Sequence, residues 1–148
     1  MTFTLDEGWT GFRHYDDAFS VGKEDPALFL SMARDVKAGI GGATVEPGTA
    51  GFEAFLGSIS QLRPEAAAPV TVGGIEGIQV DVVANGDAGG LYQVAKDQYN
   101  LSAGQKARFI ILEVEGTTVV LVFESGSEED FDEVEAEVQP VLNSLAFE

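Results

Sequence analysis

Two neighbouring segments late in the chain are apolar on both faces, and this feature constrains the fold most. Residues 109–112 and 119–123 consist almost entirely of β-branched, aromatic and other large apolar side chains, which favour strands. A strand whose two faces are both apolar must be covered on both. Glu115-Gly116 lies between the segments and suits a two-residue hairpin loop. We therefore predict that 107–114 and 117–123 form an antiparallel pair at the centre of a sheet.

The middle of the chain predicts a helix. Thr49 is suited to the N-cap position. Pro64 should end the helix, because proline pushes the residue before it out of helical geometry. Apolar residues between these two recur at helical spacing and form one face: Phe52, Phe55, Leu56, Ile59 and Leu62.

The end of the chain predicts a second helix, over residues 128–145. Ser127 and Asp130 match a capping pattern, and acidic residues in the first turn are favoured by the helix dipole. Pro140 lies inside this helix and is expected to kink it. One face is apolar and should be buried: Phe131, Val134, Val138, Val141, Leu142 and Leu145.

The remaining segments add further strands. We expect a short strand at 3–5, a hairpin of 9–15 with 18–21, and strands at 69–72 and 77–83. Residues 28–36 fit a strand or a short helix, and we favour the strand. Residues 85–90 are predicted to form a loop, and the pattern over 91–104 leaves strand and turn open. No internal repeat or linker interrupts the chain, so residues 1–148 are predicted to form a single α+β domain.

Charge and composition exclude several classes of function. The net charge is −17, from 25 acidic and 8 basic residues, so nucleic acid and anionic membranes should be repelled. The acidity serves solubility, a salty habitat or a basic partner, and the sequence leaves these open. The absence of cysteine excludes disulfides and thiolate chemistry. No apolar run is long enough for a membrane span, and residues 1–7 do not resemble a signal peptide.

No recognisable catalytic, cofactor-binding or metal-binding motif is present. His14 is the only histidine, and although Asp16 and Asp17 are close, we interpret it as a solvated side chain without a placed partner. The acidic run 128–133 lacks the spacing of a calcium loop and is interpreted as a helix start. Paired carboxylates for glycoside hydrolysis stay open, because 25 acidic residues allow many pairs. Trp9 and three tyrosines form no obvious sugar platform.

The order of these segments resembles a known family. It is carried by residues 3–9, by the pattern V-x-V-G-G-x-x-G that begins at Val70, by the hairpin over 110–120, and by residues 141–147. Together they are similar to the Mog1/PsbP-like family of small exported bacterial proteins, which are often lipoproteins. The resemblance implies an antiparallel sheet with helices packed on its two sides. It also implies a non-enzymatic role, and the chain departs from the family in lacking a lipid-anchor cysteine.

Three hypotheses follow from residues and resemblance together. The first is a non-catalytic, extracytoplasmic binding or accessory domain, without a cofactor, whose partner is a protein or a small molecule. The second is an acidic cytoplasmic chaperone or adaptor, similar to secretion chaperones, if Met1 is the native start. The third is a carboxylate-dependent hydrolase. The sequence does not predict the oligomeric state.

Overall fold

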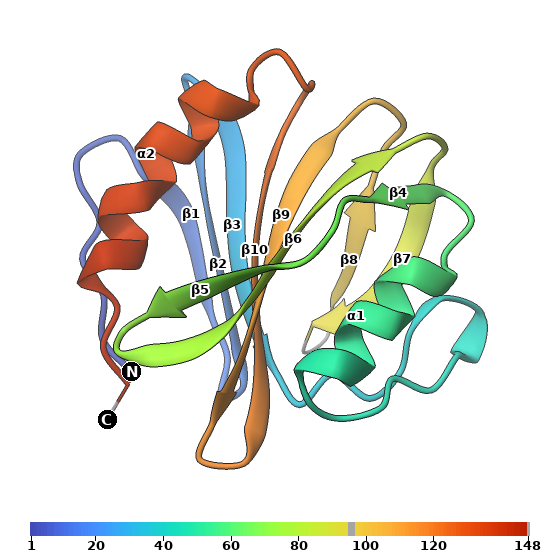
Figure 1. Ribbon diagram of the computed structural model, residues 1–148. Coiled ribbons are helices and arrows are strands. Elements are labelled where there is room, and N and C mark those ends of the chain that lie inside the picture. The colour runs from blue at the N-terminus through green and yellow to red at the C-terminus, as the bar shows by residue number, and fades with distance from the viewer. Residues whose placement is uncertain (95–96, 148) are drawn as a thin grey trace.

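A strongly bent antiparallel sheet with two helices makes up the fold in the computed structural model, which describes residues 1–94 and 97–147 (Figure 1). The strand order is β1-β2-β3-β10-β9-β6-β4, and β5 also pairs with β6. The α+β class and the antiparallel sheet are therefore confirmed. The strands of this sheet are β1 (Thr10–His14), β2 (Ala18–Glu24), β3 (Ala27–Arg34), β4 (Leu62–Pro64), β5 (Ala68–Val72), β6 (Ile75–Ala84), β9 (Lys106–Val114) and β10 (Thr117–Ser125).

The hairpin of β9 and β10 forms the centre of the sheet, as predicted. Val114 pairs with Thr117 around the loop Glu115-Gly116, and both loop residues have positive φ, as a type I′ turn requires. β10 pairs with β3 on its other side and β9 with β6, so neither is an edge strand.

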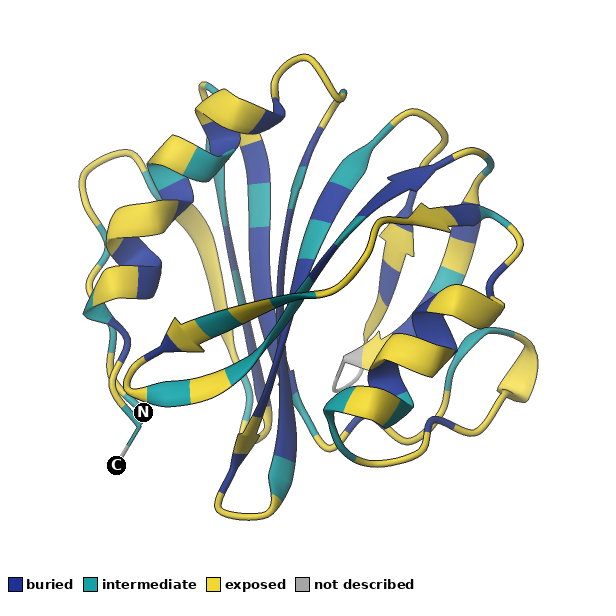
Figure 2. Cartoon of the chain, viewed as in Figure 1, coloured by how far each residue is buried: buried dark blue, intermediate teal, exposed yellow. Residues whose placement is uncertain are grey.

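Alternate residues of the central strands belong to two separate core clusters. On β10, Val120 and Val122 belong to one cluster, while Leu121 and Phe123 belong to the other. Figure 2 shows that the central strands are buried along most of their length. The first cluster includes buried side chains of α1 (Thr49–Ser58), and the second includes those of α2 (Phe131–Ser144). We expect a core formed by the apolar helix faces and the central hairpin, and eleven residues from these segments are confirmed as buried: Phe52, Phe55, Leu56, Ile59, Phe109, Ile111, Leu121, Phe123, Val138, Leu142 and Leu145.

A second, two-stranded sheet resolves the segment that the sequence left open. It consists of β7 (Ala88–Val94) and β8 (Asp97–Leu101). Leu91, Tyr92 and Tyr99 are buried in the same cluster as α1. The predicted loop over 85–90 is therefore too long, because β7 already begins at Ala88. Residues 95–96, between the two strands, lie outside the described part of the chain.

The first helix ends earlier than predicted. α1 ends at Ser58, Gly48 rather than Thr49 is its N-cap, and Ile59 has an extended backbone. The chain then pairs with β6 as β4, with Leu62 opposite Ala84. Pairing with a distant strand thus overrides the helical spacing of the last two apolar positions. A short 3₁₀ turn at Ile40–Gly42 precedes the helix.

Both ends of the chain also differ from expectation. Residues 3–5 form no strand, because the N-terminal segment makes only a single bridge, between Thr2 and Ala146. α2 begins at Phe131, since the Ser127 hydroxyl accepts a hydrogen bond from the Asp130 backbone N–H in a turn that precedes the helix. The helix continues through Pro140, and the kink expected there stays a prediction. No helix within residues 1–94 and 97–147 is long and apolar enough to cross a membrane.

Leu142→Ala should destabilise the domain by about 2–5 kcal/mol, because it leaves a cavity between α2 and the sheet. Leu142 is buried in the cluster that holds α2. Its neighbour Asn143 is exposed, so Asn143→Ala is the matched control and should cost less than about 0.5 kcal/mol. Urea unfolding measures both. Equal free energies of unfolding for Leu142→Ala and wild type would show that α2 does not pack as described.

Candidate functional site

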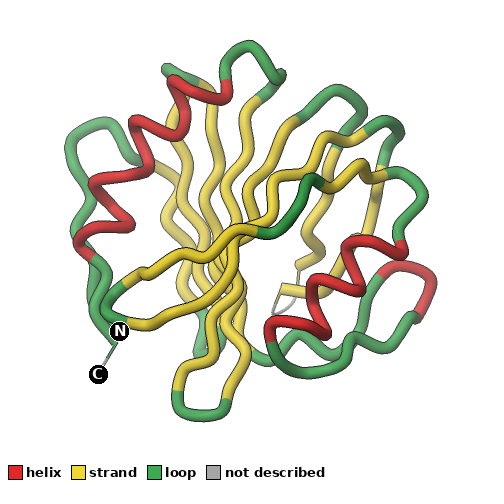
Figure 3. The backbone as a smooth tube through the Cα atoms, in the orientation of Figure 1, coloured by secondary structure: helices red, strands yellow, loops and turns green. Residues whose placement is uncertain are grey.

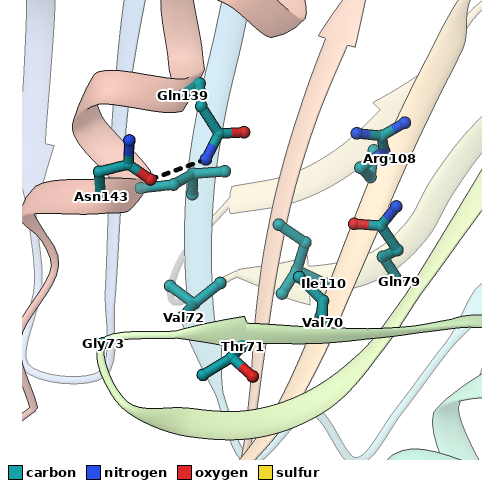
Figure 4. Close-up of a pocket in the computed structure, with 10 residues that line it drawn as sticks. Val70, Thr71, Val72, Gly73, Gln79, Arg108, Ile110, Gln139 and Asn143 are labelled. Atoms are coloured by element: carbon teal, nitrogen blue, oxygen red, sulfur yellow. Dashed lines mark hydrogen bonds between the residues drawn. The ribbon is translucent and has the colours of Figure 1, made fainter.

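The candidate site is a groove between α2 and β5 (Figure 4). Its volume of about 310 Å³ lies at the small end of the range for ligand pockets. Four elements and one turn contribute to its lining, which consists of Val70, Thr71 and Val72 on β5, Gly73 in the turn after it, Gln79 on β6, Arg108 and Ile110 on β9, and Gln139, Leu142 and Asn143 on α2.

The bend of the β5–β6 ribbon forms the groove. The ribbon crosses the central strands toward α2 (Figures 1 and 3), and Val70, Val72 and Ile75 pack on the same core cluster as that helix. At the tip, Gly73 has a φ of 59°, and a Cβ there would lie 2.9 Å from the Leu145 backbone oxygen. Only glycine permits this close approach. The ribbon tip is therefore held against the end of α2.

Three carboxamide side chains supply most of the polar groups in the groove. Gln139 donates a hydrogen bond to Asn143 at 2.8 Å, one turn along α2. Gln79 makes no side-chain hydrogen bond to any residue in the described part of the chain. Each carboxamide both donates and accepts hydrogen bonds and carries no charge. This wall is suited to groups that themselves donate and accept.

Arg108 is charged, but two carboxylates balance it. Its Nε and Nη2 donate to the two Asp81 oxygens at 2.6 and 3.0 Å, and its Nη1 donates to Glu135. The guanidinium also lies over the rings of Phe123 and Phe131. These hydrogen bonds, Asp81 foremost, raise the pKa of Arg108 above its usual value despite the opposing effect of burial. Arg108 therefore holds its proton and offers no free charge to an anion.

The chemistry available in the groove is hydrogen bonding above an apolar floor. Arg108 is the only charged side chain among the lining residues, and Thr71 is the only one with a hydroxyl group. The floor consists of Val70, Val72 and Ile110 with part of Leu142. Such a surface fits an uncharged ligand that has both polar groups and an apolar part.

The residues considered from sequence lie elsewhere. His14 is exposed at the end of edge strand β1, with its ring 6.2 Å from that of Phe12, and Asp16 and Asp17 occupy the adjacent turn. The acidic run 128–133 forms the turn before α2 and its first residues. Within the residues that the structure describes, no group of three or more metal-ligating side chains is placed to hold an ion. None of these side chains lines the groove.

Glu124 is a partly buried carboxylate that sequence reasoning missed. It lies on β10, and the Tyr99 hydroxyl donates a hydrogen bond to its Oε2 at 2.5 Å. Burial raises the pKa of Glu124 to about 7, although the Tyr99 hydrogen bond opposes this effect. The sequence did contain an indication of this site. Glu124 alternates with Val120 and Val122 along the strand, so it lies on the same face, and that face was expected to be covered.

Two buried hydroxyls accompany this carboxylate. The Tyr92 hydroxyl and Ser31 Oγ have no hydrogen-bond partner among the described residues. Burial, and then the charge of Glu124, raise the pKa of Tyr92. A hollow of about 160 Å³ lies beside Glu124, which is the one acidic side chain among its lining residues. Glycoside hydrolysis uses a pair of carboxylates.

Comparison with known proteins finds similarity of structure alone. No protein-family model and no curated protein matches this chain. A Bacteroides thetaiotaomicron protein is 11% identical, with a TM-score of 0.47 over 99% of this chain and 44% of that one. A protein of unknown function from Pseudomonas aeruginosa is 10% identical, with a TM-score of 0.49 over 98% of this chain and 86% of that one. This chain therefore spans less than half the length of the first.

Glu124→Gln should stabilise the domain at pH 8 by about 3 kcal/mol and much less at pH 5. The pKa of Glu124 is raised from 4.5 to about 7 in the folded state, so its contribution to stability is present below pH 4.5 and is lost as the pH rises to 7. Glutamine keeps an acceptor for Tyr99 and removes the titration. Unfolding free energies measured from pH 4.5 to 8 give the difference.

Glu53→Gln, at an exposed position on α1 beyond its first turn, is the control for this measurement. It should change the unfolding free energy little at any pH. A difference between Glu124→Gln and wild type that stays constant across the pH range would contradict the raised pKa.

Proposed function

We propose that this domain is a non-catalytic binding or accessory protein that holds an uncharged ligand in the groove between α2 and β5. The observation that carries this proposal is the chemistry of the lining. It combines three carboxamides, Gln79, Gln139 and Asn143, with an arginine whose charge is balanced. Such a lining is suited to recognise amide and hydroxyl groups, and it offers nothing that prefers an anion.

The same lining favours binding over catalysis. General acid–base catalysis needs a group that exchanges a proton near the working pH, and nucleophilic catalysis needs an activated hydroxyl, thiol or amine. Arg108 keeps its proton, and no base lines the groove beside the Thr71 hydroxyl. Glu124 titrates near neutral pH, but the lining of the groove does not include it.

We further propose that the sheet and helices form a Mog1/PsbP-like sandwich, with α1 and α2 on its two sides, and that the domain works outside the cytoplasm. The separate core clusters that contain α1 and α2 support the first part. The resemblance of the ordered segments supports the second, since the family consists of exported bacterial proteins.

An NMR screen of uncharged fragments against the ¹⁵N-labelled chain tests the proposed site. Fragments that carry amide or hydroxyl groups should shift the backbone signals of 70–73 and the side-chain amide signals of Gln79, Gln139 and Asn143. The double variant Gln139→Ala/Asn143→Ala should weaken this binding at least tenfold, because it removes most of the polar wall.

Gln98→Ala is the matched control, because it removes an exposed carboxamide on β8, a strand that does not line the groove. Its binding should equal that of wild type. Fragments whose shifts map outside the groove, or whose affinity survives the double variant, would overturn the proposed site.

A further inference from the structure

The outer edge of β5 runs along the groove. β5 pairs with β6 alone, and four consecutive residues, Val70 to Gly73, line the cavity. Side chains of a strand alternate between its two faces. A cavity that contacts four consecutive residues therefore follows the edge of the strand, where the backbone itself is exposed.

The turn at the end of β5 determines which backbone groups face this cavity. Gly73 and Gly74 have φ angles of 59° and 79°, as a two-residue type I′ hairpin requires. Val72 and Ile75 flank the loop, and in such a hairpin these residues exchange both backbone hydrogen bonds. Because bonded pairs alternate along an antiparallel ladder, Thr71, opposite Glu76, directs its N–H and C=O away from β6.

Those outward groups are unpaired in the described chain. No hydrogen bond from outside β6 reaches the backbone of Thr71 from residues 1–94 or 97–147. Across the groove stand the carboxamides of Gln139 and Asn143 (Figure 4). An unpaired strand edge is a template for another strand, and a carboxamide offers the same donor and acceptor as a peptide group.

We propose that the groove binds a short, extended, uncharged peptide segment of a partner protein, which adds as a strand to the outer edge of β5. This inference rests on the proposed function and specifies its ligand. The segment exchanges hydrogen bonds with the Thr71 backbone and presents its other edge to Gln139 and Asn143. Its alternate side chains point to the floor formed by Val72 and Ile110, so the inward one is apolar.

Size and charge limit the segment further. A volume of about 310 Å³ holds only a few residues. The net charge of −17 repels acidic sequences at long range, and Arg108 is already paired with Asp81 and Glu135 and cannot offset that repulsion. A neutral segment of alternating polar and apolar residues fits both limits.

The test uses a five-residue peptide of alternating threonine and valine, acetylated and amidated at its ends, in an NMR titration of the full ¹⁵N-labelled chain. The peptide should shift the Thr71 amide and the side-chain amides of Gln139 and Asn143. Thr71→Pro removes the outward N–H at an edge position that tolerates proline, and affinity should fall at least tenfold. Thr71→Ala keeps that N–H and should bind within about threefold of wild type.

A second measurement does not depend on the folding of a variant. Five versions of the peptide, each N-methylated at one residue, are titrated against the wild-type chain. N-methylation removes one donor, and at least one version should bind at least tenfold more weakly.

The outcomes separate this inference from the proposed function. If fragments shift the groove and the peptide does not, strand addition is wrong and the binding site stands. Peptide binding that survives both Thr71→Pro and every N-methylation would also overturn strand addition, because only side chains would then be recognised. If neither fragments nor peptide shift the groove, both proposals fail.

Discussion

The rest of the structure depends on burying both faces of the β9–β10 hairpin. Its side chains alternate between two core clusters, and neither face is stable in water without a covering layer. α1 and the β7–β8 hairpin contribute to the first cluster, and α2 and the β5–β6 ribbon contribute to the second. The groove follows from this need for cover. It lies where α2 and the β5–β6 ribbon cover neighbouring parts of the same face of the sheet.

A charged network fixes α2 beside that groove. Arg108 on β9 joins Asp81 on β6 to Glu135 on α2, with its guanidinium stacked over Phe123 and Phe131. A largely buried ion pair of this kind adds little net stability, because desolvation offsets the attraction. Removing one partner, however, would leave an unbalanced charge under the helix. The network joins α2 to β6 and β9 beside the groove that Arg108 lines.

The sequence predicted the structure well wherever the apolar residues on one strand or helix were enough to show which of its faces is buried. The doubly apolar segments predicted the central hairpin, and helical spacing predicted the buried face of α2. Helical spacing failed at Ile59 and Leu62, because α1 ends at Ser58 and Leu62 pairs with Ala84 on β6 instead. No sequence pattern predicted the groove, because Gln139 and Asn143 look in the sequence like ordinary exposed polar residues of a helix. Glu124 escaped notice because β8, which carries Tyr99, lies in a segment whose pattern was ambiguous.

Native-state hydrogen exchange tests most directly whether the β9–β10 hairpin is the centre of stability. An amide that is exposed only by global unfolding has an opening free energy equal to the free energy of unfolding. Amides in edge strands and at chain ends become exposed by local opening, which costs less free energy. The structure predicts that the amides in 107–113 and 118–124 exchange slowest. Their opening free energies should equal the free energy of unfolding measured in urea. Amides of β1 and the outward Thr71 amide should exchange many times faster. If the hairpin exchanged as fast as β1 while α2 stayed protected, the central role of the hairpin would be contradicted.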